Sequence, residues 1–222
     1  MTGPLRASGL AFLLAALVVG CAGRAPKPET ATAVGPSLER EQVTVLLEEA
    51  RLARAKGDLP SATGSARRAL AGARRGNWSD LASDAHFLLG EIFGQQRLPR
   101  QSAEAFAQAF EASRRVNDRG HGIRALNALA NILLDLGDYD RAFEASAQAL
   151  RLARSVGDLR AQSTALNNVG DTHRFSGRLV AAMDSYREAL TLAQRAGTSQ
   201  DVIVILENIG STARRQGQIE EA

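Results

Sequence analysis

A unit of forty residues repeats along this chain. Large apolar residues recur at that step as Leu70, Phe110, Leu150 and Leu190, and an alanine precedes each of them. A second series stands twenty positions earlier and consists of the small residues Ala50, Gly90, Ala130, Gly170 and Gly210. A period between about twenty and fifty residues is typical of a solenoid, in which each unit buries its apolar face on the next.

Each repeat is predicted to contain two helices. In the unit 121–160, apolar residues within 123–133 follow the spacing of one helix face, and a second apolar stripe runs through 139–153. Gly137 and Gly157 follow the two stripes, where helices usually stop. The Gly137 slot is occupied in the other repeats by Gly57, Arg97, Gly177 and Gly217. Turns of about three residues make neighbouring helices antiparallel.

Small residues are expected where paired helices approach most closely. The positions concerned are Ala142, Gly170, Ala182 and Gly210. A larger side chain there would push the backbones apart, at a cost of about 1–3 kcal/mol by overpacking.

The residues of the fourth repeat resemble a known family. Its pattern of large, small and aromatic residues is similar to the tetratricopeptide repeat, and especially to the forty-residue variety, through Leu166, Val169, Gly170, His173, Leu179, Ala182, Tyr186 and Ala189. The resemblance covers residues 38–222 and implies an all-α fold, a right-handed α-solenoid of antiparallel helix pairs. It implies four full repeats and a truncated fifth, at about 38–80, 81–120, 121–160, 161–200 and 201–222.

The first twenty residues have a different character. Arg6 provides a positive charge, and residues 10–19 form an apolar run that is shorter than the roughly 20 residues a membrane span needs. Such a run is typical of a signal peptide. It ends at Gly20-Cys21, which resembles the bacterial lipobox, in which the cysteine is lipidated and becomes the new N-terminus. We predict a lipoprotein signal peptide over 1–20; the alternative is an ordinary secretory signal with a chance cysteine.

Two observations favour the prediction of a lipoprotein signal peptide. Cys21 is the only cysteine, and residues 22–37 contain Pro26, Pro28 and Pro36 with no periodic apolar pattern. Residues 21–37 are therefore expected to form a flexible tether between the lipid and the repeat domain at 38–222. The resemblance implies acylation of Cys21 with several fatty acids such as palmitate. It also implies sorting to the outer membrane, facing the periplasm, because Ala22 rather than aspartate follows the cysteine.

Composition argues against several function classes. Aromatic residues make up only 5%, so alanine and leucine must do most of the packing. The net charge is +3, from 27 basic and 24 acidic residues, and the arginine pairs are interleaved with aspartate and glutamate. This pattern favours solvated helix faces over nucleic-acid binding.

Nothing in the sequence points to an enzyme. The three histidines, His86, His121 and His173, form no zinc pattern, and there is no cysteine pair, phosphate-binding glycine loop or nucleophile turn. His86 and His173 fall on repeat positions that are expected to be buried. We expect no catalytic residue, metal or cofactor.

Binding is expected in the groove that the resemblance assigns to the first helices of the repeats. The polar residues implied to line it are Arg124, Asn127, Asn131, Thr164, Asn167, Asn168, Asp171, Arg174, Glu207, Asn208, Ser211 and Arg214. Amide side chains both donate and accept, so a row of them suits an extended peptide backbone, and the arginines suit acidic groups. The alternative is a merely solvated polar face. Leu47, Phe87 and Leu88 take the equivalent slots earlier, which predicts an apolar groove there.

The last residues match the start of a second helix, because 217–222 corresponds to 137–142. Apolar residues of the preceding helix are then expected to lack cover, and we predict self-association through 201–222; they are Val202, Ile203, Ile205, Leu206 and Ile209. The leading functional hypothesis is a non-enzymatic, lipid-anchored scaffold that binds a partner protein or peptide. The alternative is an N-terminal sensor or docking module of a longer protein, whose protease-like or signalling domain is absent from this chain.

Overall fold

The computed structural model describes residues 39–217, which form nine α-helices and no strand. The helices are α1 (Arg40–Ala55), α2 (Leu59–Arg75), α3 (Ser79–Gln95), α4 (Pro99–Arg115), α5 (Arg119–Asp135), α6 (Tyr139–Val156), α7 (Leu159–Phe175), α8 (Leu179–Ala196) and α9 (Ser199–Gln216). The prediction of an all-α repeat fold is confirmed. The predicted signal peptide, the tether, Cys21 and residues 218–222 lie outside the described residues. None of the described helices is long and apolar enough to cross a membrane.

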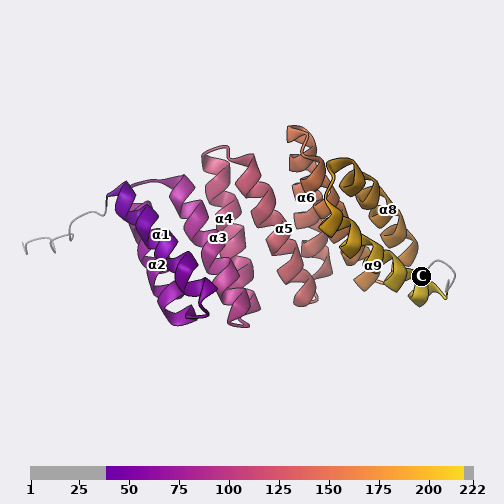
Figure 1. Ribbon diagram of the computed structural model, residues 1–222, viewed down its shortest axis with the longest axis horizontal. Coiled ribbons are helices and arrows are strands. Elements are labelled where there is room, and N and C mark those ends of the chain that lie inside the picture. The colour runs from indigo at the N-terminus through magenta and orange to yellow at the C-terminus, as the bar shows by residue number, and fades with distance from the viewer. Residues whose placement is uncertain (1–38, 218–222) are drawn as a thin grey trace, which may run out of the picture. The chain divides into compact units, whose positions relative to one another are not determined.

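Helices α1 to α9 are stacked in chain order, each packed on the next (Figure 1). Contacts also join α1 to α3, α3 to α5, α5 to α7 and α7 to α9. Within residues 39–217, by contrast, the backbones of the even-numbered helices do not approach one another closely, and α6 and α8 are joined by the side chains of Arg154 and Glu188 at 3.0 Å. The odd-numbered helices are therefore closer together, and the stack curves with these helices on its inner side. We call the surface formed by α1, α3, α5, α7 and α9 the odd-helix face.

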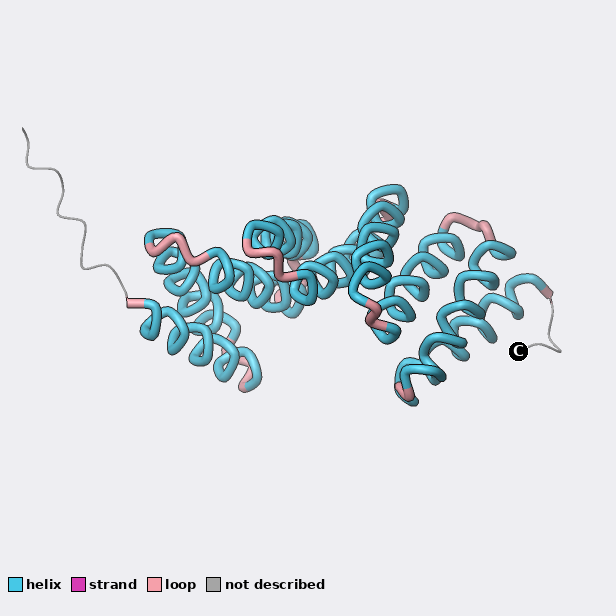
Figure 2. Tube along the Cα trace, turned by 90° about the horizontal axis from the view of Figure 1, so that it is seen from above, coloured by secondary structure: helices cyan, strands magenta, loops and turns pink. Residues whose placement is uncertain are grey.

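Short turns repeat the same backbone geometry (Figure 2). After α5, Gly137 has φ +74°. Its own N–H donates to the Leu134 carbonyl at 3.0 Å, and the Asp138 N–H donates to the Leu133 carbonyl at 2.9 Å. This left-handed cap suits glycine, which has no Cβ to clash. Arg97 adopts φ +57° in the equivalent slot of the second repeat. The predicted equivalence of Arg97 and the glycines is confirmed by the backbone.

Helix starts are fixed by aspartate at several turns. The side chain accepts a hydrogen bond from a backbone amide three residues later at Asp58, Asp118, Asp138 and Asp158. This contact satisfies one of the amides that a helix start leaves without an internal partner.

Small residues do mark the close approaches of helices. A Cβ on Gly170 would lie 2.5 Å from the Tyr186 ring, and one on Gly90 would lie 2.7 Å from the Phe106 ring. Ala142 and Ala182 are fully buried. In the second and fourth repeats the core thus packs a glycine of the first helix against an aromatic ring of the second, surrounded by alanine and leucine.

Candidate functional site

The predicted binding residues lie on three helices of the odd-helix face. They are Arg124, Asn127 and Asn131 on α5, Asn167, Asn168, Asp171 and Arg174 on α7, and Asn208, Ser211 and Arg214 on α9. Because α5 contacts α7 and α7 contacts α9, the structure brings side chains that are about forty residues apart to neighbouring positions.

Several of these amides connect one repeat to the next. Asn208 Nδ2 donates to Asn167 Oδ1 at 3.0 Å, and Asn167 Nδ2 donates to Asp171 Oδ2 at 3.2 Å. Asn168 Nδ2 points to the backbone carbonyl of Asn127 at 3.4 Å. We call the contacts Asn208–Asn167 and Asn168–Asn127 the amide bridges. They pre-order the α5, α7 and α9 surface.

Asn168 requires a correction. Its side chain is only 3% exposed and lies between α5 and α7, so it does not line the open groove as expected. The reason is that its register position matches Leu88, which is also buried in this structure. Asn168 therefore serves the packing of repeats, and its amide is not available to a partner.

A hydrogen-bonded cluster lies beside the amide bridges. Tyr186 Oη donates to Asp171 Oδ1 at 2.8 Å, and the Arg174 guanidinium donates to both Tyr186 Oη at 3.1 Å and Asp171 Oδ1 at 3.0 Å. Burial, reinforced by the Asp171 carboxylate, raises the pKa of Tyr186, so its hydroxyl keeps its proton and remains a donor. Asp171 and Arg174 are thereby held in fixed orientations at the surface.

Five predicted residues remain open to a partner. Among the described residues, Arg124, Asn131, Glu207, Ser211 and Arg214 make no side-chain hydrogen bond or ion pair, and all but the half-buried Ser211 are exposed. The Arg124 guanidinium rests 5.7 Å from the centre of the Phe87 ring. Asn127 is half-buried, and its Oδ1 is buried without a hydrogen-bond partner in residues 39–217.

The prediction of an apolar groove in the first repeats is wrong for Leu47 and Leu88, whereas Phe87 is half-buried beside Arg124. Leu47 and Leu88 are 1% and 2% exposed, because their side chains belong to the core between helices. Ion pairs occupy the odd-helix face there instead, joining Arg54 to Glu91 at 3.0 Å and Arg40 to Asp80.

His121 joins α3 to α5 in a way that the sequence did not reveal. Its Nε2 lies 2.6 Å from Asp84 Oδ1, and its Nδ1 lies 3.0 Å from Asp118 Oδ2. The hydrogen bond to Asp84, helped by Asp118, raises the pKa of His121. The i, i+3 spacing of Asp118 and His121 was a local signal, but Asp84 comes from the preceding repeat.

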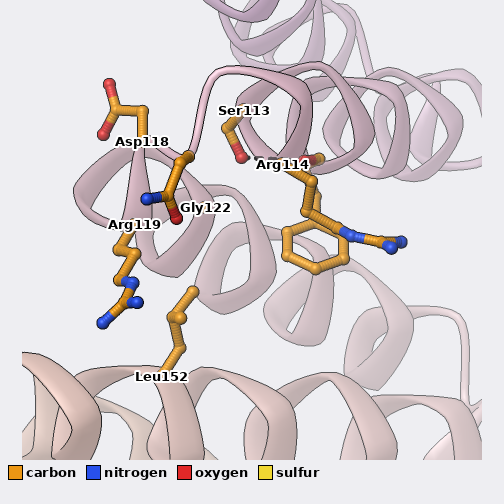
Figure 3. A pocket seen from close by; sticks show the side chains of 8 residues that line it. Ser113, Arg114, Asp118, Arg119, Gly122 and Leu152 are labelled. Carbon is orange, nitrogen blue, oxygen red and sulfur yellow. Dashed lines mark hydrogen bonds between the residues drawn. The ribbon is translucent and has the colours of Figure 1, made fainter.

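Cavities lie away from the predicted groove residues. One of about 210 Å³ is enclosed by α4, α5 and α6, where Leu152 projects toward Gly122 (Figure 3). A Cβ on Gly122 would meet Ser113 Oγ at 3.1 Å and Leu152 Cδ2 at 3.3 Å, so glycine lets α4 and α6 side chains approach α5 closely at this point. No group of three or more histidine, cysteine or acidic side chains within residues 39–217 is arranged to hold a metal ion.

Solved structures show the same fold. BtubC from P. vanneervenii superposes with a TM-score of 0.70 at 23% identity, over 82% of this chain and 74% of that one. The apo form of RapI gives 0.72 at 15% identity, over 79% and 64%. A putative kinesin light chain from Podosopora anserina, described by its nearly identical TPR-like repeats, gives 0.65 at 12% identity, over 81% and 89%. The chain thus spans about two thirds to nine tenths of these proteins.

Sequence comparison is more specific about the family than about the individual protein. A search of curated protein sequences finds no significant match. The tetratricopeptide repeat model matches residues 81–155, 123–195 and 162–222. Together these matches span 81–222, which is 142 of the 222 residues. The chain therefore belongs to the tetratricopeptide repeat family.

Proposed function

We propose that the chain is a non-enzymatic scaffold that binds a partner protein or an extended peptide on its odd-helix face. Proteins with this repeat generally mediate protein–protein interaction. The observation that carries the proposal is the combination of ordered and free polar groups on α5, α7 and α9. Asp171 and Arg174 are held in place by Tyr186, while Arg124 and Arg214 form no ion pair in the described part of the chain, Arg124 acting on Asp118 only through its charge.

These groups match the needs of an extended backbone with acidic ends or side chains. Amides that are already oriented lose little entropy on binding, and unpaired guanidinium groups gain charge-assisted hydrogen bonds. Support for occupancy of such a fold comes from a Rap protein complexed with Competence and Sporulation Factor, which superposes with a TM-score of 0.63 at 14% identity. The superposition covers 81% of this chain and 52% of that one.

Site-specific photo-crosslinking in the producing cell tests this function. A photoreactive residue in place of the exposed Asn131, or of Arg214, is expected to yield the same discrete crosslinked partner. The matched control carries it in place of Arg151, which is exposed on α6. Equal crosslinking from Arg151, or none from the odd-helix face, would exclude partner binding there. Asn131 and Arg214 suit this experiment because their removal breaks no contact between repeats.

Lipid anchoring at Cys21 is a separate part of the proposal. The support is the apolar run ending at Gly20-Cys21 and the proline-containing stretch that follows it. Attachment there would place the repeat domain at the periplasmic side of the outer membrane. Cells fed labelled palmitate are expected to label the wild-type chain and not Cys21→Ser. An unlabelled wild-type chain would show that the protein is secreted without an anchor.

Self-association through α9 is the remaining part. Ile203 and Leu206 are 52% and 49% exposed, whereas the equivalent Ile123 and Leu126 are 3% and 2% exposed. Ile205 was also expected to be open, but it is 2% exposed because it packs in the core with Leu166 and Tyr186. We propose that a second copy covers the open side, since an apolar surface of this kind favours association.

Sedimentation of the 222-residue chain tests this association. Ile203→Glu with Leu206→Glu should shift it toward monomer, while Val180→Glu, at an exposed site on α8, should not. A wild-type chain that is monomeric throughout would refute the proposal.

A further inference from the structure

A second charged cavity lies on the side of the stack opposite the odd-helix face. It has a volume of about 460 Å³ and lies between α2 and α4, with α3 as its floor. Arg67 and Arg74 form the α2 wall, Gln101, Glu104 and Gln108 form the α4 wall, and Leu89 and Phe93 lie in the floor. We call this space the α2–α4 cavity.

His86 in the floor departs from the repeat pattern. Leucine stands at the equivalent position in three other repeats, as Leu46, Leu126 and Leu166, each no more than 5% exposed. His86 is also buried, at 8% exposed, but it adds polar atoms where those repeats have only carbon. A polar ring at a core leucine position gives up apolar contact and must have its polar atoms satisfied, so we expect His86 to have a role that offsets this cost.

The neutral His86 ring has one hydrogen-bond donor, at Nδ1, without a partner in the described residues. Its Nε2 lies 3.3 Å from an Arg74 guanidinium nitrogen. Burial, with the nearby Arg74 charge, lowers the pKa of His86 to about 4, so the ring is neutral at pH 7. Because Arg74 can only donate, Nε2 must accept, and the ring proton lies on Nδ1. Within residues 39–217, Nδ1 makes no hydrogen bond, and it is not among the fully buried unpaired atoms.

The two arginines of the α2 wall also lack acidic partners. Among the described residues, the only contact of the Arg67 guanidinium is with the Phe93 ring, at 6.0 Å, and Arg74 contacts only His86. The neighbouring cavity of Figure 3 differs, because its Arg114 is bound by both carboxylate oxygens of Glu111 at 3.1 Å and Asp118 lies in its wall. The arginines of the α2–α4 cavity are therefore free of ion pairs, with Glu104 on the opposite wall, whereas Arg114 of the neighbouring cavity is paired.

We propose that the α2–α4 cavity binds an acidic peptide segment of a partner protein, with its carboxylate on the α2 wall and an adjacent apolar side chain on Leu89 and Phe93. Arg67, Arg74 and the Nδ1 proton of His86 supply donors for that carboxylate. Gln101 and Gln108 supply amides that pair with a peptide backbone. Glu104 disfavours a carboxylate at the α4 wall and so sets the orientation of the segment. This site shares no residue with the predicted groove on the odd-helix face.

Fluorescence anisotropy with three labelled peptides tests the site on the 222-residue chain. The probe is acetyl-Gly-Asp-Leu-Phe-Gly-amide. One control peptide has lysine in place of aspartate, and the other has serine in place of both leucine and phenylalanine. The site requires saturable binding of the probe and clearly weaker binding of both controls. No binding of the probe, or equal binding of the lysine peptide, would overturn the proposal.

Variants then assign the binding to named side chains. Arg74→Gln should weaken the probe about tenfold or more, through loss of a charge-assisted contact. Glu104→Gln should tighten it about two- to fivefold by removing an exposed repulsion. Arg114→Gln makes the same charge change at the neighbouring cavity and should leave affinity unchanged. If Arg74→Gln and Arg114→Gln weaken binding equally, general surface charge explains it and the site is refuted.

His86→Leu separates binding from folding. It installs the residue that the other repeats use, so the thermal midpoint should be kept or raised while probe affinity falls. Unchanged affinity in a folded His86→Leu chain would remove His86 from the site. His86→Gln, which restores a donor, is expected to recover part of the affinity, and failure to do so would count against the role assigned to Nδ1.

Discussion

The second and fourth repeats both pack a glycine against an aromatic ring, but the ring is phenylalanine in the second and tyrosine in the fourth. Gly90 lies under Phe106 and Gly170 lies under Tyr186, in both cases with too little room for a Cβ. The hydroxyl of Tyr186 adds hydrogen bonds to Asp171 and Arg174, which Phe106 cannot form. Both repeats share a buried hydrogen bond between their helices, from Ser83 to the Ala109 carbonyl and from Ser163 to the Ala189 carbonyl. The comparison shows that these contacts and the apolar ones build the helix pair, while the tyrosine hydroxyl contacts belong to the fourth repeat.

The contacts between successive odd-numbered helices show the same difference. Between α1 and α3 they are ion pairs, such as Arg54–Glu91, and between α3 and α5 a histidine lies between carboxylates. From α5 to α9 they include the amide bridges, together with one exposed ion pair between Arg160 and Asp201 at 3.1 Å. Charged contacts respond to pH and salt, whereas neutral amides do not. The stability of the two ends of the stack should therefore depend differently on pH and salt.

The largest effect is expected from filling the glycine–aromatic contacts. Gly170→Val should lower the free energy of unfolding by about 3 kcal/mol, because the new side chain meets the Tyr186 ring. Gly90→Val should cost less, since Phe106 has no hydroxyl holding it in place and its ring can tilt. Urea denaturation followed by circular dichroism measures both. A smaller loss for Gly170→Val than for Gly90→Val would contradict the proposed difference between the repeats.

Tyr186→Phe converts the fourth repeat to the chemistry of the second. Loss of the hydroxyl leaves the Asp171–Arg174 pair but removes two hydrogen bonds in a half-buried setting, at a cost of about 1–2 kcal/mol. Tyr139→Phe is the matched control, because Tyr139 stacks on Phe175 without a side-chain hydrogen bond in the described residues. Equal losses from the two variants in urea denaturation would show that the hydroxyl contact adds nothing.

The pH dependence should separate the two ends of the stack. Because the pKa of His121 is raised on folding, its contribution to stability is fully present below its unfolded pKa of about 6.5 and declines as pH rises through the folded value. The stability difference between wild type and His121→Gln should therefore shrink from pH 6 to pH 8. For Asn208→Ala, which removes an amide bridge, the difference should stay constant. Parallel pH profiles would refute the distinction.

The smallest effect concerns the turn of the second repeat. Arg97 adopts φ +57°, where the first, third and fourth repeats have glycine. Arg97→Gly should raise the free energy of unfolding by about 0.5–1 kcal/mol by relieving the left-handed strain. Asn117→Gly should gain less, because asparagine tolerates this conformation. Thermal unfolding of both variants tests the order, and a loss of stability in Arg97→Gly would contradict it.

Most of the fold was predictable from local signals. The forty-residue period, the apolar stripes and the turn glycines all act within one or two helices, so a linear pattern records them. The structure places Gly137 and Gly157 at the predicted turns and Gly170 against Tyr186. Solenoid contacts are between neighbours, which makes sequence patterns unusually informative.

The site was less predictable because the burial and hydrogen bonding of its side chains depend on residues about forty positions away. The sequence shows that Asn168 is polar, but not that the Asn127 carbonyl stands beside it. The apolar pattern of α9 likewise contains two possible stripes. Only packing on α7 and α8 shows that Ile205 is buried and that Ile203 and Leu206 are open. Asp84, which pairs with His121, is far from it in the sequence, so no local spacing predicts their contact.

The one-sided contacts between alternate helices have a mechanical consequence. Since only the odd-numbered helices bring their backbones close to those of their second neighbours, the line along them acts as a hinge when the stack bends. Even-numbered helices lie farthest from that line, so a small change of curvature alters the spacing of α2 and α4 more than the spacing of α1 and α3. A molecule that flattens or tightens the inner side therefore changes the width of the cavity beside Arg74 without touching it.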